Sequence, residues 1–148
     1  MPRDRDMQAN FLRLDPEVEI PTRGHIGDAA VDLQTRTDFS LEPGARASIP
    51  TGLVVAIPEG HAGLVLPRSG HALRSGVGVV NGPGLIDSGY RGEVSVLLIN
   101  HGSEPVSFVK GDRIAQLAVV PMMSVEWVEV ETLDETSRGS GGFGSTGS

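Results

Sequence analysis

The chain has 148 residues, no cysteine and a formal net charge of −7 at pH 7. The lack of cysteine excludes disulfides, thiolate metal sites and a cysteine nucleophile, and the acidic balance argues against a general nucleic-acid binder. No apolar run approaches the roughly 18 residues of a membrane span, and the polar start MPRDRDMQAN lacks the apolar core of a secretory signal. We therefore expect one cytoplasmic domain that binds neither nucleic acid nor membrane.

Short apolar or β-branched runs, each bounded by Gly, Pro, Asp or Asn, predict an all-β domain. In chain order the runs span residues 10–15, 39–43, 53–58, 62–67, 77–81, 93–100, 113–121 and 124–133, and a further strand starts in DAAVDL. The run EVSVLLIN is apolar at nearly every position, so we expect both of its faces to be covered, by a second sheet or by another subunit. The pattern predicts a jelly-roll-like β-barrel or sandwich.

The segment RSGHALRSG is the single helix candidate, and Ser69 is available as its N-cap. The preceding PRSGHA joins a strand to this helix. Backbone N–H groups at a helix start, the hydroxyl of Ser69 and the guanidinium of Arg68 would form a phosphate-binding corner, and Gly70 would let a ligand approach the backbone. A plain helix cap is the alternative interpretation of this stretch.

Two further polar clusters interrupt the strands. DAAVDL contains Asp28 and Asp32, and an Asp in a turn usually bonds only its own backbone. In KGDRIAQL, Asp112 and Arg113 lie in a turn before Gln116 on the next strand. Taken alone, this cluster indicates a tight turn whose charges are solvated or paired.

The stretch VVNGPGLIDSGYRGEV has more turn-forming residues than one hairpin requires. An extended hairpin here could present backbone N–H and C=O groups to the edge of a planar base, and the Asn81 amide both donates and accepts. Asp87 could accept a proton from a water. The stretch therefore favours a nucleotide site with Asp87 as the candidate base.

The C-terminal SRGSGGFGSTGS has too little apolar surface to order itself. It nevertheless contains Arg138 and Phe143, which a flexible linker does not need. We expect this tail to close on something. The sequence divides into a loose arm over residues 1–10, a barrel over residues 11–136 and a C-terminal lid over residues 137–148.

Together these stretches resemble the trimeric dUTPase family. The five motifs of that family occur in order as DAAVDL, PRSGHA, NGPGLIDSGYRGE, GDRIAQ and RGSGGFGSTG, from Asp28 to Gly147. The joint match is specific, whereas each fragment alone is weak. The sequence departs from the usual pattern at a few positions beside backbone-mediated contacts, namely Ala30, His71, Gly82 and Leu85.

The resemblance implies a homotrimer with three active sites at the subunit junctions, which convert dUTP to dUMP and pyrophosphate by water attack on the α-phosphate. Such an activity keeps uracil out of DNA and supplies dUMP for thymidylate synthesis. Mg²⁺ would be held by the substrate phosphates and waters, with no direct protein ligand. Asp87 would be the base, and Asp32 would support Arg68 or a water on the metal.

The remaining roles also follow from the resemblance. Phosphate contacts would come from Arg68, Ser69, Gly70 and Gln116. The uracil would be read by Asn81, the backbone of Leu85, Ile86 and Asp87, and the backbone of Ser95, with Tyr90 under the deoxyribose. In the lid, Phe143 would stack on the uracil, and the γ-phosphate would be held by Arg138, Ser145, Thr146 and Gly147.

Two rival functions are open to the same fold. A dCTP deaminase is related in fold but lacks this glycine-rich closing motif with its aromatic residue. A catalytically silent nucleotide-binding module is the second alternative, and the ionisable Asp87 together with the intact lid motif argues against it.

Overall fold

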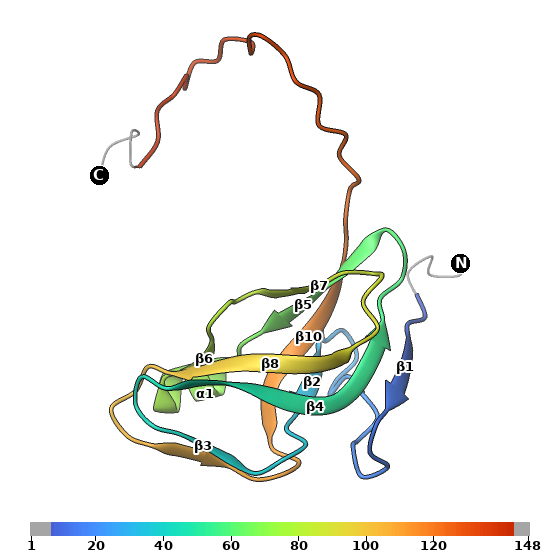
Figure 1. Ribbon diagram of the computed structural model, residues 1–148, viewed down its shortest axis with the longest axis vertical. Helices are drawn as coiled ribbons and strands as arrows, with labels where there is room; N and C mark the ends of the chain where they lie inside the picture. Colours follow the sequence, from blue (N-terminus) through green and yellow to red (C-terminus); the bar gives the residue numbers. More distant parts are fainter. Residues whose placement is uncertain (1–6, 144–148) are drawn as a thin grey trace.

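The computed structural model describes residues 7–143, and within this range the chain folds into antiparallel sheets with one short helix (Figure 1). One four-stranded sheet has the order β1-β4-β8-β6, a second has the order β2-β10-β5-β7, and β3 and β9 form a separate pair. The elements are β1 (Asn10–Arg13), β2 (Val31–Gln34), β3 (Phe39–Leu41), β4 (Arg46–Ala56), β5 (His61–Leu66), α1 (Ser69–Ser75), β6 (Val77–Val79), β7 (Gly84–Ile86), β8 (Glu93–Asn100), β9 (Val106–Phe108) and β10 (Arg113–Pro121).

The core lies between the two four-stranded sheets, which confirms the all-β, jelly-roll-like prediction. Leu33 of β2 and Ile114 of β10 are almost completely buried, as are Val96 and Leu98 of β8. On β8 the apolar side chains alternate between the buried face and the opposite face, where Leu97 is 37% exposed. The chain itself therefore covers only one face of EVSVLLIN, and the expected cover of the other face would have to come from another subunit.

The strand predicted over residues 124–133 is wrong for this chain. β10 ends at Pro121, and in the described range the hydrogen bonds of residues 123–143 all join residues of that same segment. Trp127 and Leu133 are 91% and 84% exposed. A strand needs a neighbour to pair its backbone N–H and C=O groups, and the chain offers none here. We call residues 122–143 the C-terminal arm, and Figure 1 shows it arching away from the sheets.

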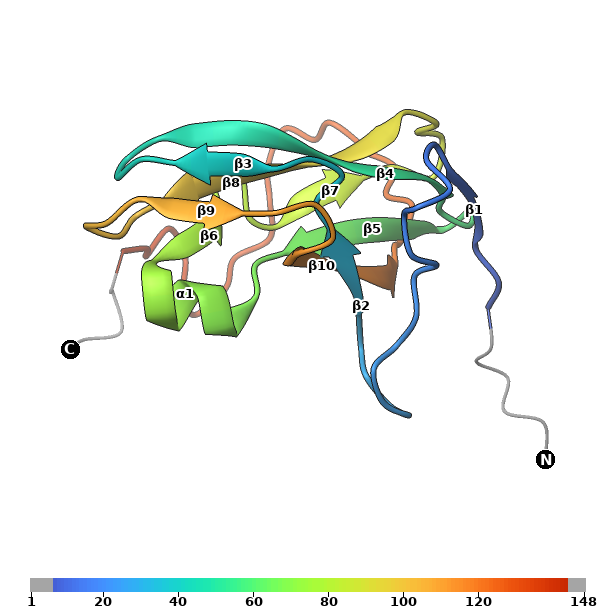
Figure 2. The same ribbon diagram turned by 90° about the horizontal axis from the view of Figure 1, so that it is seen from below.

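Two local predictions also need correction. The NGPG stretch does not make a hairpin, because β6 pairs with β8 while β7 pairs with β5, so the turn crosses from one sheet to the other. Ser69 is not the N-cap of α1 but its first residue, and Arg68 occupies the cap position without a side-chain cap. Figure 2 shows α1 at the end of the sheets, beside β6 and β9. No helix within the described range is long and apolar enough to cross a membrane.

Candidate active site

Strand pairing brings three polar segments to one edge of the second sheet. Gln116 of β10 lies opposite Leu66 of β5 on one side and opposite Asp32 of β2 on the other. Arg68 follows Leu66 by two residues, and its guanidinium reaches the Asp32 carboxylate. The sequence separation between these residues is large, but the antiparallel register places them on neighbouring strands.

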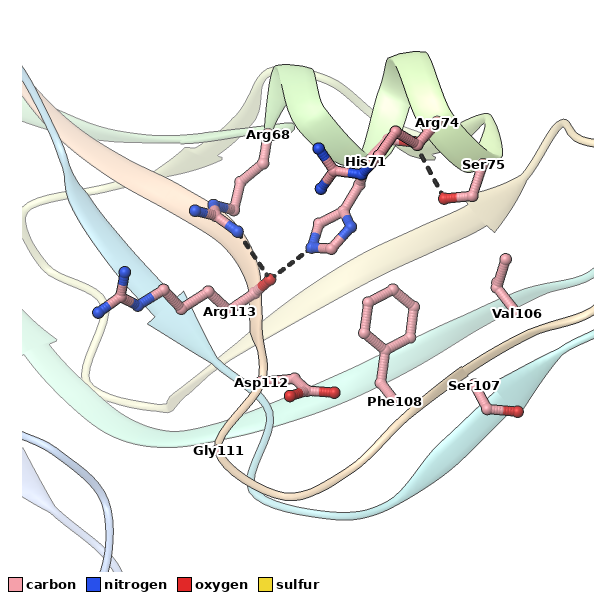
Figure 3. A pocket seen from close by; sticks show the side chains of 10 residues that line it. All are labelled: Arg68, His71, Arg74, Ser75, Val106, Ser107, Phe108, Gly111, Asp112 and Arg113. Atoms are coloured by element: carbon pink, nitrogen blue, oxygen red, sulfur yellow. Dashed lines mark hydrogen bonds between the residues drawn. The ribbon is translucent and has the colours of Figure 1, made fainter.

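Ion pairs and hydrogen bonds hold this group in place, and Figure 3 draws the hydrogen bonds that join Arg68 and His71 to Arg113. The Asp32 carboxylate lies 3.1 Å from Nε of Arg68 and 3.6 Å from Nε of Arg113. The backbone carbonyl of Arg113 accepts from the Arg68 guanidinium at 3.3 Å and from Nε2 of His71 at 2.7 Å. Gln116 donates to the carbonyl of Pro67 at 2.9 Å. We call Asp32, Arg68, His71, Arg113 and Gln116 the arginine corner.

The arginine corner borders a cavity of about 610 Å³ between α1, β9 and the start of β10. Three guanidinium groups line it, those of Arg68, Arg74 and Arg113. A Cβ added at Gly70 would lie 3.0 Å from the guanidinium nitrogens of Arg74, so the backbone at Gly70 lies close beneath that group. A polar, arginine-lined cavity of this kind can bind an anion with several oxygens, such as a phosphate chain.

Sequence reasoning missed Arg113 and His71 as members of this group. Regular alternation would place Arg113 and Gln116 on opposite faces of β10. A register shift between Arg113 and Ala115 leaves the consecutive residues Ile114 and Ala115 both buried, so Arg113 and Gln116 both lie outside the core. A β-bulge of this kind has no clear sequence signal here. His71 was noted only as a departure from the family pattern.

A second, separate cavity of about 190 Å³ lies at the predicted uracil and sugar site. We call residues 81–95 the Asp87 segment. The backbone N–H of Tyr90 donates to the carbonyl of Asp87 at 3.1 Å, and the Tyr90 hydroxyl donates to the carbonyl of Glu93 at 3.0 Å. Asn81 lies close to Gly84 at the start of this segment. The cavity is lined by Leu85, Ile86, Asp87, Tyr90, Glu93, Val94 and Ser95.

The Asp87 segment and the arginine corner do not meet within one chain. Ile86 pairs with Gly63, three residues along β5 from Leu66, and Asp87 continues away from the corner. β7 and β2 are the outer strands of their four-stranded sheet. With strand spacings of about 4.8 Å and a rise of about 3.3 Å per residue, Asp87 and Asp32 lie roughly 20 Å apart.

The lid residues of the described range, Arg138 and Phe143, line neither of these two cavities. Arg138 donates from Nε to the carbonyl of Gly141 at 2.9 Å, and Phe143 is fully exposed. Both lie at the end of the C-terminal arm, which Figure 1 shows extending away from the sheets. The other predicted lid residues, Ser145, Thr146 and Gly147, lie outside the described residues.

The metal-binding chemistry of the described residues is limited. No group of three or more His, Asp or Glu side chains gathers among residues 7–143. The Asp32 carboxylate of the arginine corner is shared by two guanidinium groups.

Comparison with known proteins identifies the family. The dUTPase family model matches residues 16–147. The chain belongs to the dUTPase family. A dUTPase-family relative, the deoxyuridine 5'-triphosphate nucleotidohydrolase of Nocardia farcinica, is 56% identical over 136 residues, covering 91% of this chain and 82% of the relative.

Solved structures of dUTPases share the fold. The dUTPase of Staphylococcus bacteriophage 80alpha with dUPNHPP has a TM-score of 0.87 and 30% identity, covering 95% of this chain and 99% of that one. A mutant dUTPase from phage phi11 of S. aureus, described with a structural Mg(II) ion, has a TM-score of 0.78 and 28% identity, covering 85% and 98%. Both structures share the overall fold of this chain over most of its length.

Proposed function

We propose that this chain hydrolyses dUTP to dUMP and pyrophosphate at a site assembled from several copies of itself. The separation of roughly 20 Å between Asp87 and Asp32 in one chain carries the proposal. A general base must lie within hydrogen-bonding reach of its water, and that water attacks the phosphate chain that Arg68 would hold. If a second copy supplies the Asp87 segment, Asp87 can lie within reach of the phosphate chain that Arg68 holds.

A homotrimer with cyclic symmetry meets the requirement. Each site would take its arginine corner, its Asp87 segment and its lid from different copies. The C-terminal arm, with the exposed Trp127 and Leu133, and the uncovered face of β8, with Leu97, support such an assembly, because contiguous exposed apolar side chains mark interaction surfaces. We retain the division into an arm over residues 1–10, a domain over 11–136 and a lid over 137–148, in which the sheets of the domain end at Pro121 and residues 122–136 form the first part of the C-terminal arm.

The chemistry is a hydrolysis at the α-phosphorus. The Asp87 carboxylate takes a proton from a water as its oxygen bonds to the α-phosphorus. The bond from that phosphorus to the oxygen bridging to the β-phosphate breaks, and pyrophosphate leaves with that oxygen. Arg68 and Gln116, with Ser69 and Gly70, stabilise the charge that develops on the leaving group. Asp32 holds Arg68 in place through their ion pair.

Substrate recognition divides between the Asp87 segment and the lid. Asn81 and the backbone of residues 85–87 and 95 read the uracil edge, and Tyr90 packs under the deoxyribose. Phe143 stacks on the uracil when the lid closes. The γ-phosphate is held by Arg138, Ser145, Thr146 and Gly147.

A magnesium ion fits this site as part of the substrate complex, held by phosphate oxygens and waters. The donor set of the described residues supports this arrangement, because the Asp32 carboxylate is already paired with guanidinium groups. When bound, the ion would neutralise charge on the phosphate chain. The protein groups would then orient the chain toward Asp87.

The proposal predicts strong selectivity for dUTP over dCTP, dTTP and UTP. An edge reader built for uracil leaves mismatched donors facing cytosine and crowds the thymine methyl group, and Tyr90 lies where a ribose 2'-hydroxyl would sit. Pyrophosphate release from each nucleotide gives the four kcat/KM values. Release of ammonia from dCTP would instead indicate a deaminase, and no product from any nucleotide would indicate a silent binding module.

Asp32→Asn should lower kcat/KM for dUTP by roughly 10- to 100-fold, the loss expected when a charge-assisted contact worth about 1.5–3 kcal/mol is removed. The Asn side chain keeps the shape but loses the charge that orients Arg68. Asp28→Asn is the matched control, since Asp28 lies in the same DAAVDL motif and accepts from the backbone of His25. Equal kcat/KM values for the two variants would show that Asp32 has no role in the site.

A further inference from the structure

Gly92 lies directly against the ring of Tyr90. A Cβ built at Gly92 would be 2.3 Å from the Tyr90 hydroxyl oxygen and 2.6 Å from Cζ, closer than real side chains approach. The φ of Gly92 is not in the left-handed region, so its backbone conformation is open to other residues. A side chain at this position is therefore opposed by the present place of the Tyr90 ring and not by backbone strain.

A hydrogen bond also holds the end of the Tyr90 ring. The Tyr90 hydroxyl donates to the backbone carbonyl of Glu93. The Glu93 side chain is itself held where the pairing of β4 with β8 shifts register. Its carboxylate accepts from the backbone N–H of Gly52 at 2.8 Å and forms an ion pair with Arg36 at 3.4 Å. The next carbonyl, that of Val94, accepts from the buried hydroxyl of Thr51 at 2.6 Å.

We propose that Gly92 is a positioning residue that sets the selectivity for the 2'-deoxy sugar by fixing Tyr90. The inference rests on the proposed function, in which Tyr90 excludes a ribose 2'-hydroxyl. Tyr90 is 46% exposed and lines the cavity beside Asp87, so few neighbours within its own chain hold the ring. The close approach to Gly92 and the bond to Glu93 define its position. A side chain at position 92 would push the ring toward the sugar or out of the cavity.

Gly92→Ala should reduce the ratio of kcat/KM for dUTP over UTP by about tenfold or more, the scale on which steric fit discriminates similar substrates. Gly89→Ala is the matched control. Gly89 lies in the same loop between β7 and β8, also without a left-handed φ, and a Cβ built there meets nothing within 4 Å. We expect Gly89→Ala to keep the wild-type ratio, and both variants to unfold at similar temperatures.

A double-mutant cycle separates positioning from a general structural role. In a Tyr90→Ala background the ring is gone, so adding Gly92→Ala should leave the dUTP/UTP ratio within about twofold. An equal loss of selectivity with and without Tyr90 would overturn the inference, as would an unchanged ratio in Gly92→Ala alone. If Gly92→Ala alone does not fold, the double variant decides. Removal of the clash should restore folded protein with the selectivity of Tyr90→Ala, and failure to do so contradicts the inference.

The wild-type enzyme distinguishes this inference from the proposed function. If wild type does not release pyrophosphate from dUTP, or hydrolyses UTP equally well, the proposed function or the role of Tyr90 is wrong. If wild type is selective and Gly92→Ala matches Gly89→Ala, only the role of Gly92 is wrong.

Discussion

Asp87→Asn should lower kcat for dUTP by about 10²–10⁴-fold, the range typical of a lost general base. The substitution keeps the shape of the side chain and removes its ability to accept the proton of the attacking water. Asp87 lines the cavity with Tyr90 and Ser95, so an Asn should still fit there. A non-hydrolysable dUTP analogue should therefore bind with near wild-type affinity, as measured by titration calorimetry.

Ser88→Ala, the next position in the same turn, is the control for Asp87→Asn and should keep most of the activity. Near wild-type kcat in Asp87→Asn would assign the base elsewhere, and Asp32 would be tested next. Loss of analogue binding together with kcat would show that Asp87 acts in binding and not in proton transfer.

Deletion of residues 138–148 should abolish most activity, by at least about 10²-fold, while the fold and the trimer persist. Within the described range, the hydrogen bonds of Arg138 and Gly139 join residues of the arm itself, and Phe143 is fully exposed, so the sheets lose almost nothing. The bound nucleotide loses the stacking contact of Phe143 and the phosphate contact of Arg138. Thermal unfolding checks the fold, and sedimentation checks the trimer. The single variants Phe143→Ala and Arg138→Ala show how much of the lost activity each side chain accounts for. Full activity in the deletion would exclude a lid role for the tail.

Much of the fold could be predicted from local sequence pattern. The apolar run of β8 and the bounded runs of β5 and β10 became strands, because each buries one face against the other sheet. The arginine corner was predicted only in part. Arg68 and Gln116 were expected to contact phosphates, but the membership of Arg113 depends on a bulge in β10, which the sequence does not indicate.

Two of the wrong predictions concern features that depend on distant partners. Residues 124–133 have the composition of a strand, but strand formation needs a neighbour that this chain does not supply. The NGPG turn has hairpin residues, but each flanking strand finds its partner elsewhere, β6 with β8 and β7 with β5. Local propensity predicts a turn or an extended segment, and tertiary pairing decides what is connected.

The most direct test of a site shared between chains is complementation of two inactive variants. The chain lacking residues 138–148 retains Asp87, and full-length Asp87→Asn retains the lid, so the two are refolded together and mixed trimers are verified by native mass spectrometry. In a cyclic trimer whose Asp87 segment and lid come from different chains, each mixed trimer contains one site with both intact parts. We predict that dUTP hydrolysis returns in the mixture. Confirmed mixed trimers without activity would show that one chain supplies both parts, and would contradict the shared site.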